Sequence, residues 1–174
     1  MDQPTWNPAA KSASLRKWAE SLHREAKRVF LEDGTHGRML FLFDDNGIAS
    51  VNPIPADTTP IQVTVGVRRA IQDHNLYGVI TIAEAWTYMP KTPKDHAVFQ
   101  LLDGEMTVSE MKEGDKIEAL MVRMDSRDQD HVTWLDVIER TGEKVRLGRC
   151  IRLRKEYWLN LRGFFEEEEN GNEA

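Results

Sequence analysis

Two glutamates within apolar stretches are the residues best suited to chemistry. Glu84 and Glu118 are each followed by an alanine, as Glu84-Ala-Trp86 and Glu118-Ala-Leu120. If their strands are neighbours, the two carboxylates could share a site, raise the pKa of one of them and serve as general acid and base. We favour the alternative that Glu118 begins its strand in solvent and Glu84 pairs with a lysine or arginine, since structural ion pairs also perturb pKa values.

His36 is the histidine placed best for function, because it lies in a glycine-flanked junction between a predicted helix and a predicted strand. It could bind a metal together with Asp44, Glu84 or His96. However, the chain has no His-x-His, Cys-x-x-Cys or His-Glu-x-x-His spacing. We therefore interpret His36 as a flexible-turn residue and predict no metal and no cofactor.

Other nucleophiles and bases have weaker support. His23 and His74 fall on predicted helices, where surface or capping roles are expected, and His131 opens a strand without an evident partner. Cys150 falls within a strand, where a buried and inert thiol is expected. The chain has no Gly-x-Ser-x-Gly motif and no glycine-rich phosphate loop, so we do not favour an enzyme.

Two groups of residues are candidates for contact with a partner, because aromatic, methionine and arginine side chains concentrate in interfaces. One group follows the central strand and comprises Trp86, Tyr88 and Met89. The other is a basic strand with Lys144, Arg146, Arg152 and Arg154. The basic strand is also compatible with nucleic-acid binding, or with a solvated face that protects a sheet edge, and we favour the last interpretation.

Composition limits the function. The 174 residues suffice for one domain with its own core, and a net charge of −6 makes general binding to nucleic acid unfavourable. A single cysteine, the lack of a leader pattern and the lack of a long apolar run predict a cytoplasmic protein without a membrane span. We expect a flexible arm over residues 1–11, one domain over 12–162 and a disordered acidic tail over 163–174.

Helices are predicted from apolar spacing and end signals. A stripe with helical period predicts a first helix whose apolar positions are Leu15, Trp18, Ala19, Leu22, Ala26, Val29 and Phe30. Ser12 or Ser14 is expected to cap its start, and Gly34 suits its end. Thr59 and Gln62 can form a capping box around Pro60, which predicts a second helix. Strand-like alternation is the competing interpretation there, through Ile61, Val63, Val65 and Val67.

Strands are predicted from apolar runs bounded by turn residues. Residues 77–86 form a nearly continuous apolar run, which predicts a central strand buried on both faces. Period 2 places Glu84 beside apolar side chains of this strand, so its carboxylate should have a polar partner. An apolar hairpin is predicted over residues 39–52 around Asn46-Gly47, and a further strand over 116–124. Residues 95–115 fit either a short helix or a hairpin.

The last two strands are predicted over residues 131–139 and 144–154, joined around Thr141-Gly142. Pairing Ile138 with Val145 would place Glu139 opposite Lys144 and gather the basic side chains on one face. The apolar side chains would then share the other face: Val132, Trp134, Ile138, Val145, Leu147 and Ile151. The resulting order is α-β-β-α-β, a link and β-β-β. This is an α+β fold with a mainly antiparallel sheet of about five to six strands and two packed helices.

Short motifs carry two resemblances. The Glu84-Ala-Trp86 strand end and the later segment from Ser109-Glu110 to Lys116-Ile-Glu118-Ala-Leu resemble a family of small, uncharacterised bacterial and phage α+β proteins over residues 12–154. That resemblance implies no activity. The order of elements before the central strand is also similar to JAB/MPN domains, but Ala85-Trp-Thr-Tyr-Met-Pro90 lacks their metal-binding motif. Such a relative would be a binding module.

We therefore predict a non-enzymatic cytoplasmic protein of bacterial or phage origin that binds an unknown protein partner and could form oligomers. The first alternative is a small hydrolase that uses Glu84 and Glu118, with His36 and a divalent metal as further candidates. The second alternative is nucleic-acid binding through residues 144–154, which the net charge of −6 disfavours.

Overall fold

The computed structural model describes residues 3–88, 110–112, 116–154 and 164–165. A short 3₁₀ helix, η1 (Pro8–Ala10), leads into α1 (Lys11–Asp33), and α2 (Pro60–His74) is the second helix. The strands are β1 (Met39–Asp44), β2 (Gly47–Pro53), β3 (Gly78–Tyr88), β4 (Lys116–Ser126), β5 (His131–Thr141) and β6 (Lys144–Arg154). The α+β prediction and its order of elements are confirmed.

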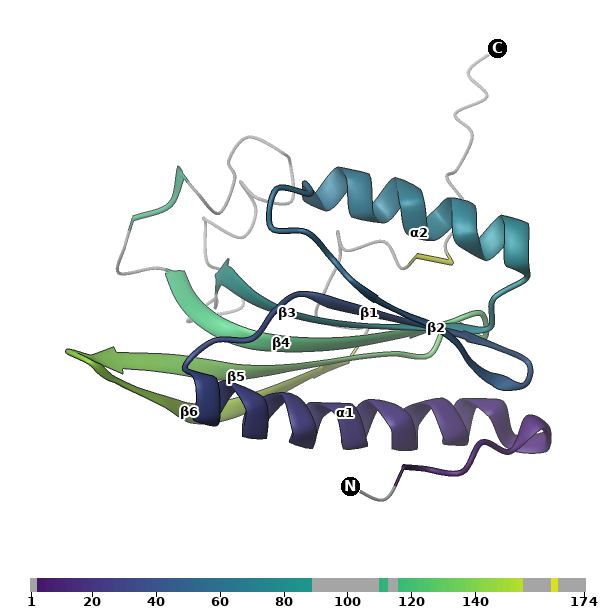
Figure 1. The fold of residues 1–174 in the computed structure, drawn as a ribbon, viewed down its shortest axis with the longest axis horizontal. Coiled ribbons are helices and arrows are strands. Elements are labelled where there is room, and N and C mark those ends of the chain that lie inside the picture. The colour runs from purple at the N-terminus through teal and green to yellow at the C-terminus, as the bar shows by residue number, and fades with distance from the viewer. Residues whose placement is uncertain (1–2, 89–109, 113–115, 155–163, 166–174) are drawn as a thin grey trace, which may run out of the picture.

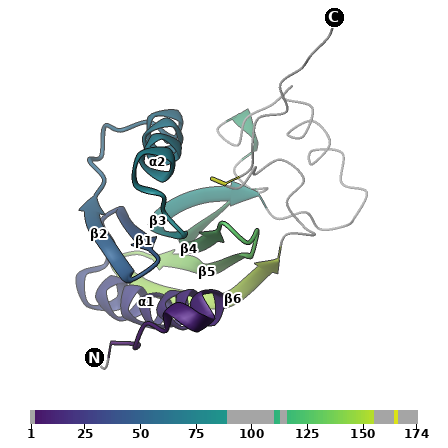
Figure 2. The same cartoon turned by 90° about the vertical axis from the view of Figure 1, so that its right-hand side faces the viewer.

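The six strands form one sheet in the order β2-β1-β3-β4-β5-β6, and every neighbouring pair is antiparallel. The two helices lie on opposite faces of this sheet (Figures 1 and 2). The predicted central strand is confirmed as β3, which lies between β1 and β4. β2 and β6 form the two edges.

Each helix covers its own apolar core. The core under α1 includes Leu15 and Phe30 of the helix and side chains from β3, β4 and β5. Gly78 permits the close approach of α1, because a Cβ atom at this position would lie 2.4 Å from Cδ2 of Leu15. A smaller core under α2 contains Leu42, Val67, Leu76 and Val79. α2 is therefore a helix with one packed stripe, and the alternative strand interpretation is wrong.

Two of the predicted helix-end features are confirmed, and one is wrong. The Thr59–Gln62 capping box of α2 is present, and Gly34 ends α1 with a φ of 74°. The predicted serine cap of α1 is wrong, because the helix follows directly on η1 and its N-cap residue is Ala10. Ser14 instead accepts a hydrogen bond from the backbone N–H of Asn7, at 2.9 Å.

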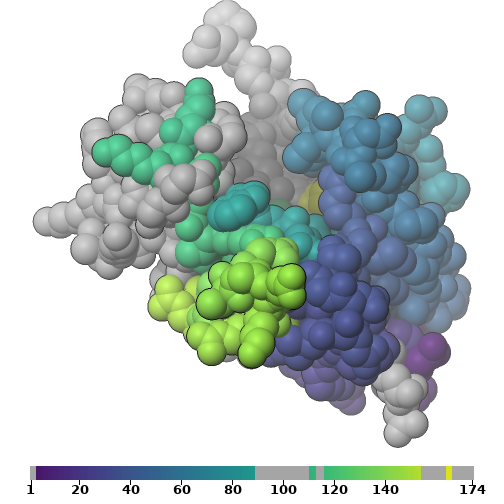
Figure 3. All heavy atoms as spheres, turned by 60° about the vertical axis from the view of Figure 1, so that its left-hand side comes forward, coloured from purple at the N-terminus to yellow at the C-terminus, as the bar shows by residue number. Residues whose placement is uncertain are grey.

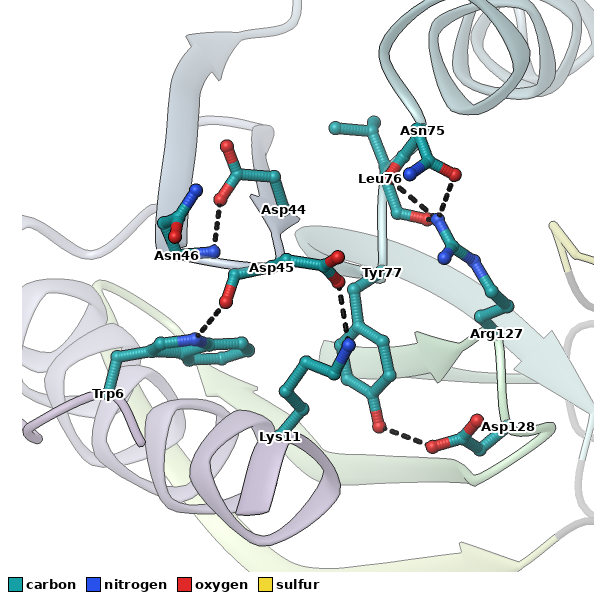
Figure 4. A network of polar contacts seen from close by, with 10 residues as sticks. All are labelled: Trp6, Lys11, Asp44, Asp45, Asn46, Asn75, Leu76, Tyr77, Arg127 and Asp128. Carbon is teal, nitrogen blue, oxygen red and sulfur yellow. Dashed lines mark hydrogen bonds and ion pairs between the residues drawn. The ribbon is translucent and has the colours of Figure 1, made fainter. Parts of the chain in front are cut away.

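Polar contacts connect the turns at one end of the molecule (Figure 4). The Trp6 indole donates to the Asp45 carbonyl at 3.0 Å and stacks on Phe43, with 5.6 Å between the ring centroids. Lys11 forms an ion pair with the Asp45 carboxylate at 2.7 Å. Arg127 donates to the Asn75 carbonyl at 2.7 Å. These contacts join the start of α1, the β1–β2 turn, the α2–β3 connection and the β4–β5 turn.

The predicted register of the last hairpin is wrong. Ile138 pairs with Leu147 instead of Val145, and Glu139 pairs with Arg146 instead of Lys144. Farther along, Asp136 pairs with Cys150, so Gly148 and Arg149 together face the single residue Val137 in a β-bulge.

The bulge also overturns the prediction of one basic face. The extra residue reverses the alternation of β6, so Arg152 pairs with Trp134 on the α1 face. Its guanidinium lies 5.5 Å from the centroid of the Trp134 ring. Arg146 is on the opposite face with Glu139, at 2.6 Å. For the same reason Ile151 pairs with Leu135, away from the apolar face on which it was expected.

Several predictions concern parts of the chain that lie outside the described residues. These are Met89, most of residues 95–115 and the acidic tail after Phe165. Neither helix has the combination of length and apolar character that a membrane crossing requires.

Candidate functional site

Glu84 and Glu118 lie on the same face of neighbouring strands. In the β3–β4 register Glu84 pairs with Leu120 and Trp86 with Glu118, so the two glutamates are diagonal neighbours. Arg140 of β5 reaches both carboxylates, at 2.6 Å from Glu118 and 3.3 Å from Glu84. Thr35, just after α1, donates its hydroxyl to Glu84 at 2.7 Å. Figure 3 shows the β5–β6 hairpin lying beside the chain that follows α1.

This arrangement fits an ion-pair cluster better than an acid–base pair. Arg140 forms an ion pair with each of the two carboxylates, which gives both of them a structural partner without any catalytic role. The expected polar partner of Glu84 is therefore Arg140, together with Thr35. Glu118 does not begin its strand in open solvent, since only 18% of its side chain is exposed.

The other residues considered for a metal site with His36 are not brought together around its ring. The His36 ring contacts the Gly37 carbonyl at 2.6 Å, and its backbone N–H donates to Glu84. Asp44 instead accepts a hydrogen bond from the backbone N–H of Asn46, at 2.6 Å. His96 lies outside the described residues.

The aromatic contact candidates differ in exposure. Trp86 is 57% exposed, and the ammonium of Lys116 lies 6.0 Å from its ring centroid. Tyr88 is buried, so the structure does not offer it as a surface contact. Of the two described aromatic candidates, only Trp86 is available to a partner.

A second polar cluster lies where sequence reasoning did not place one. The Asp136 carboxylate on β5 is fully buried and forms ion pairs with His23 and Lys27 of α1, the latter at 2.9 Å. Cys150 is the cross-strand partner of Asp136. One potential ligand atom from each of His23, Asp136 and Cys150 lies within 4.8 Å of the other two.

Two predictions about this cluster are wrong. His23 was expected at the surface, but its side chain is only 12% exposed and stacks on Trp134 with 5.4 Å between the centroids. Cys150 was expected to be buried, but it is exposed. Cys150 lies on β6, the edge strand of the sheet, and the register beyond the β-bulge pairs it with Asp136.

The electrostatics of the cluster oppose nucleophilic catalysis by the thiol. Burial would raise the pKa of Asp136, but hydrogen bonds from His23 and Lys27 outweigh it and hold that pKa below its usual value. Desolvation of the thiol and the nearby Asp136 carboxylate raise the pKa of Cys150 to about 11. Because the thiolate is the nucleophilic form, Cys150 is not an activated nucleophile at neutral pH.

A similar buried aspartate lies on the other face of the sheet. Asp125 is fully buried and contacts the Nδ1 atom of His131, which was predicted to have no evident partner. Arg123 forms an ion pair with the same carboxylate at 2.8 Å. Within the described residues two aspartates are thus fully buried, and each is paired with one histidine and with one lysine or arginine.

The sequence contained a signal for the Asp136 cluster. Asp136 lies midway between Trp134 and Ile138 in the alternation that predicts the apolar face of β5. His23 is on the apolar stripe of α1, four residues after Ala19 and three before Ala26. When each of two apolar faces carries one polar residue, we expect the two faces to pack together so that these residues can pair.

A model of a protein family described as Bacteriophage lambda protein ea47 matches residues 2–161. The match spans both helices and all six described strands. Comparisons with curated proteins and with solved structures find no match. The likeness to JAB/MPN domains stays a prediction.

Proposed function

Because the chain belongs to the family of bacteriophage lambda protein ea47, we propose that it is a phage accessory protein that acts in the cytoplasm without catalysis. Its role is to bind an acidic, extended segment of a protein partner along the edge strand β6. The observation that carries this proposal is the composition of β6, which has five basic residues and no acidic one, listed here as Lys144, Arg146, Arg149, Arg152 and Arg154.

β6 is suited to pairing with another strand. It ends the sheet next to β5, so its outer backbone N–H and C=O groups have no neighbouring strand within the described sheet. An extended peptide can add to such an edge, with affinity from main-chain hydrogen bonds and specificity from alternate side chains. Main-chain pairing at this edge tolerates many partner sequences, so the charge of the partner segment decides which segment binds.

The β-bulge distributes the positive charge over both faces of the edge. Arg146 lies on the α2 face and Arg152 on the α1 face. A partner strand directs successive side chains to alternate faces. A segment with carboxylates on both of its faces would therefore meet cations on both sides, which a one-faced stripe would not provide.

Edge protection alone accounts less well for these residues. Natural edges are protected mainly by lysine, whereas four of the five cations on β6 are arginines, which form paired hydrogen bonds with carboxylates. Among those β6 cations whose side chains the structure describes, only Arg146 has a carboxylate partner, Glu139. Lys144, Arg149 and Arg152 form no ion pair with a carboxylate of the described residues.

The charge of the chain favours a protein partner over nucleic acid. A net charge of −6 repels a polyanion of uniform charge at longer range. A short acidic peptide contacts only the local edge. Pairing with a peptide strand can satisfy both the N–H and the C=O groups on the outer side of β6, whereas a phosphate backbone has no donor for the C=O groups.

A binding assay with a fluorescent, extended peptide in which pairs of glutamates alternate with pairs of valines, so that both of its faces carry carboxylates, tests the proposal. We expect measurable binding at low salt, and no binding of a matched peptide with glutamine in place of glutamate. Arg149→Glu should weaken binding roughly tenfold or more, about 1.4 kcal/mol. Lys17→Glu, an exposed reversal on α1, is the control for net charge.

Three outcomes would overturn the proposal. Equal binding of the glutamine peptide would remove the role of charge, and equal loss in the Lys17→Glu control would remove the role of β6. Tighter binding of a DNA duplex than of the acidic peptide, with affinity falling steeply as salt rises, would assign the edge to nucleic acid.

A further inference from the structure

The cluster at the β5–β6 bulge offers three metal-binding side chains of different chemistry. We propose that His23, Asp136 and Cys150 bind one divalent transition metal ion of the zinc class. Cys150 belongs to β6, so this site adjoins the edge proposed for partner binding, but neither proposal depends on the other.

The geometry requires only small movements of side chains. The potential ligand atoms of the three residues lie within 4.8 Å of one another. Zinc holds nitrogen and oxygen ligands at about 2.0–2.1 Å and sulfur at about 2.3 Å, so ligands in a tetrahedral site lie roughly 3–4 Å apart. Rotation of the Cys150 side chain can bring its sulfur into this range, and the short contact between His23 Nε2 and Asp136 Oδ2 has to lengthen slightly to admit the ion.

The chemical types of the three ligand atoms determine which ions can bind. Imidazole nitrogen and thiolate sulfur suit zinc and similar transition metals, whereas calcium and magnesium prefer sites made of oxygen ligands. With three protein ligands a tetrahedral ion keeps one further position. Cys150 is exposed, so that position can be reached from solvent.

Neighbouring side chains already orient two of the ligands. Lys27 holds the Oδ1 atom of Asp136 at 2.9 Å, which directs the Oδ2 atom toward His23. The His23 ring is fixed by stacking on Trp134. Such outer contacts are typical of metal sites, where they set the direction of the ligands. Asp125 and His131 form a similar pair, but the only cysteine of the chain is Cys150.

Binding of the metal ion requires that its ligands give up their protons. The thiol of Cys150 releases a proton to solvent when its sulfur becomes a ligand, and the His23 nitrogen must bind in its neutral form. The ion then takes the place of the hydrogen bond between His23 and Asp136. Affinity should therefore increase as pH rises, by up to about tenfold per unit for each proton released.

Titration of the full chain with Co²⁺ tests the site, because cobalt reports its ligands by absorption. We expect one equivalent per chain to produce a thiolate-to-cobalt charge-transfer band and visible bands of tetrahedral intensity, and Zn²⁺ to remove both. Cys150→Ser should abolish the charge-transfer band. His23→Gln should weaken Co²⁺ binding about tenfold or more, while His36→Gln, in the turn after α1, should leave it unchanged.

Several results would overturn the inference. One is the absence of a charge-transfer band with excess Co²⁺. Another is a band that saturates at half an equivalent in a dimer, which would show an ion bridging two Cys150 thiolates. Unchanged Co²⁺ affinity in Cys150→Ser or His23→Gln would also overturn the inference. Circular dichroism of each variant must match the parent protein, and Cys150→Ser is the safest substitution because residue 150 is exposed.

Discussion

Asp136 and Cys150 are direct cross-strand partners, and the β5–β6 register shifts immediately beyond them. This relationship has two consequences. It places a thiol beside a buried carboxylate that α1 supplies with His23 and Lys27. It also sends the later basic residues of β6 to the face opposite the earlier ones, so one bulge shapes both the proposed metal site and the proposed binding edge.

Replacing Asp136 with asparagine should destabilise the protein substantially. The carboxylate is fully buried and binds two cationic or potentially cationic groups. Removing one partner of a buried pair costs up to about 3–5 kcal/mol, and the lower end applies because Lys27 is partly exposed. Urea unfolding at pH 7 measures the change in the free energy of unfolding.

Asp73→Asn is the matched control for that substitution. Its ion pair with Arg69, at 3.6 Å on α2, is exposed, and exposed pairs contribute about 0–1 kcal/mol. If both variants lost the same small amount, Asp136 would not be the buried anchor between α1 and β5 that the contacts indicate.

The Asp136 ion pairs should also contribute to unfolding by acid. The pKa of Asp136 is lower in the folded protein than in the unfolded chain, where it is about 3.9. Its contribution is therefore fully present above about pH 4 and is lost as pH falls through the lower, folded value. The difference in unfolding free energy between the parent protein and Asp136→Asn should shrink as pH falls below about 4, toward the folded-state pKa of Asp136. A difference that instead grew on acidification would contradict this sign.

Local signals accounted for most of the fold, and non-local ones were missed. The α2 capping box and the turn residues act over three or four positions, so their effects can be read directly from the sequence. The β5–β6 bulge contains Gly148, and although a glycine inside a strand can mark a bulge, it does not specify the register of the two strands. The predicted alignment of β5 and β6 was therefore regular, whereas the alignment in the structure contains a bulge.

In the candidate site, too, the unusual residues could be recognised locally, whereas their distant partners could not. Glu84 was recognised as an anomaly in its strand, but its partner Arg140 is 56 residues away and belongs to a strand whose neighbours could not be assigned. His23 and Asp136 are 113 residues apart. Their types and periods mark each as unusual, but only the packing of α1 across the sheet shows that they meet.

Substituting alanine for Gly78 should destabilise the protein by about 1–3 kcal/mol through overpacking. The added Cβ would lie 2.4 Å from Leu15 Cδ2, and Leu15 is fully buried, so the leucine has little room to move. Gly66→Ala is the control, because nothing lies within 4 Å of its Cβ position on α2. That variant should gain about 0.5–1 kcal/mol from helix propensity.

A double-mutant cycle separates overpacking from a general loss of strand structure. Leu15→Ala alone leaves a cavity and should cost about 2–5 kcal/mol. In the double variant the new methyl group at position 78 partly occupies that cavity, so the combined loss should be smaller than the sum of the single losses. Strict additivity in urea unfolding would show that Gly78 and Leu15 do not limit each other.

Glu84→Gln and Glu118→Gln distinguish the ion-pair cluster from the rival acid–base pair. If Arg140 stabilises both carboxylates, each substitution should lower the unfolding free energy slightly, by about 0.2–1 kcal/mol, since the Arg140 side chain is 41% exposed. Two carboxylates held together for catalysis would instead repel each other, and removing one of them would stabilise the fold. Thermal unfolding of the two variants and of Arg140→Gln tests this. A gain in stability in either glutamine variant would reject the ion-pair interpretation and return the hydrolase hypothesis to consideration.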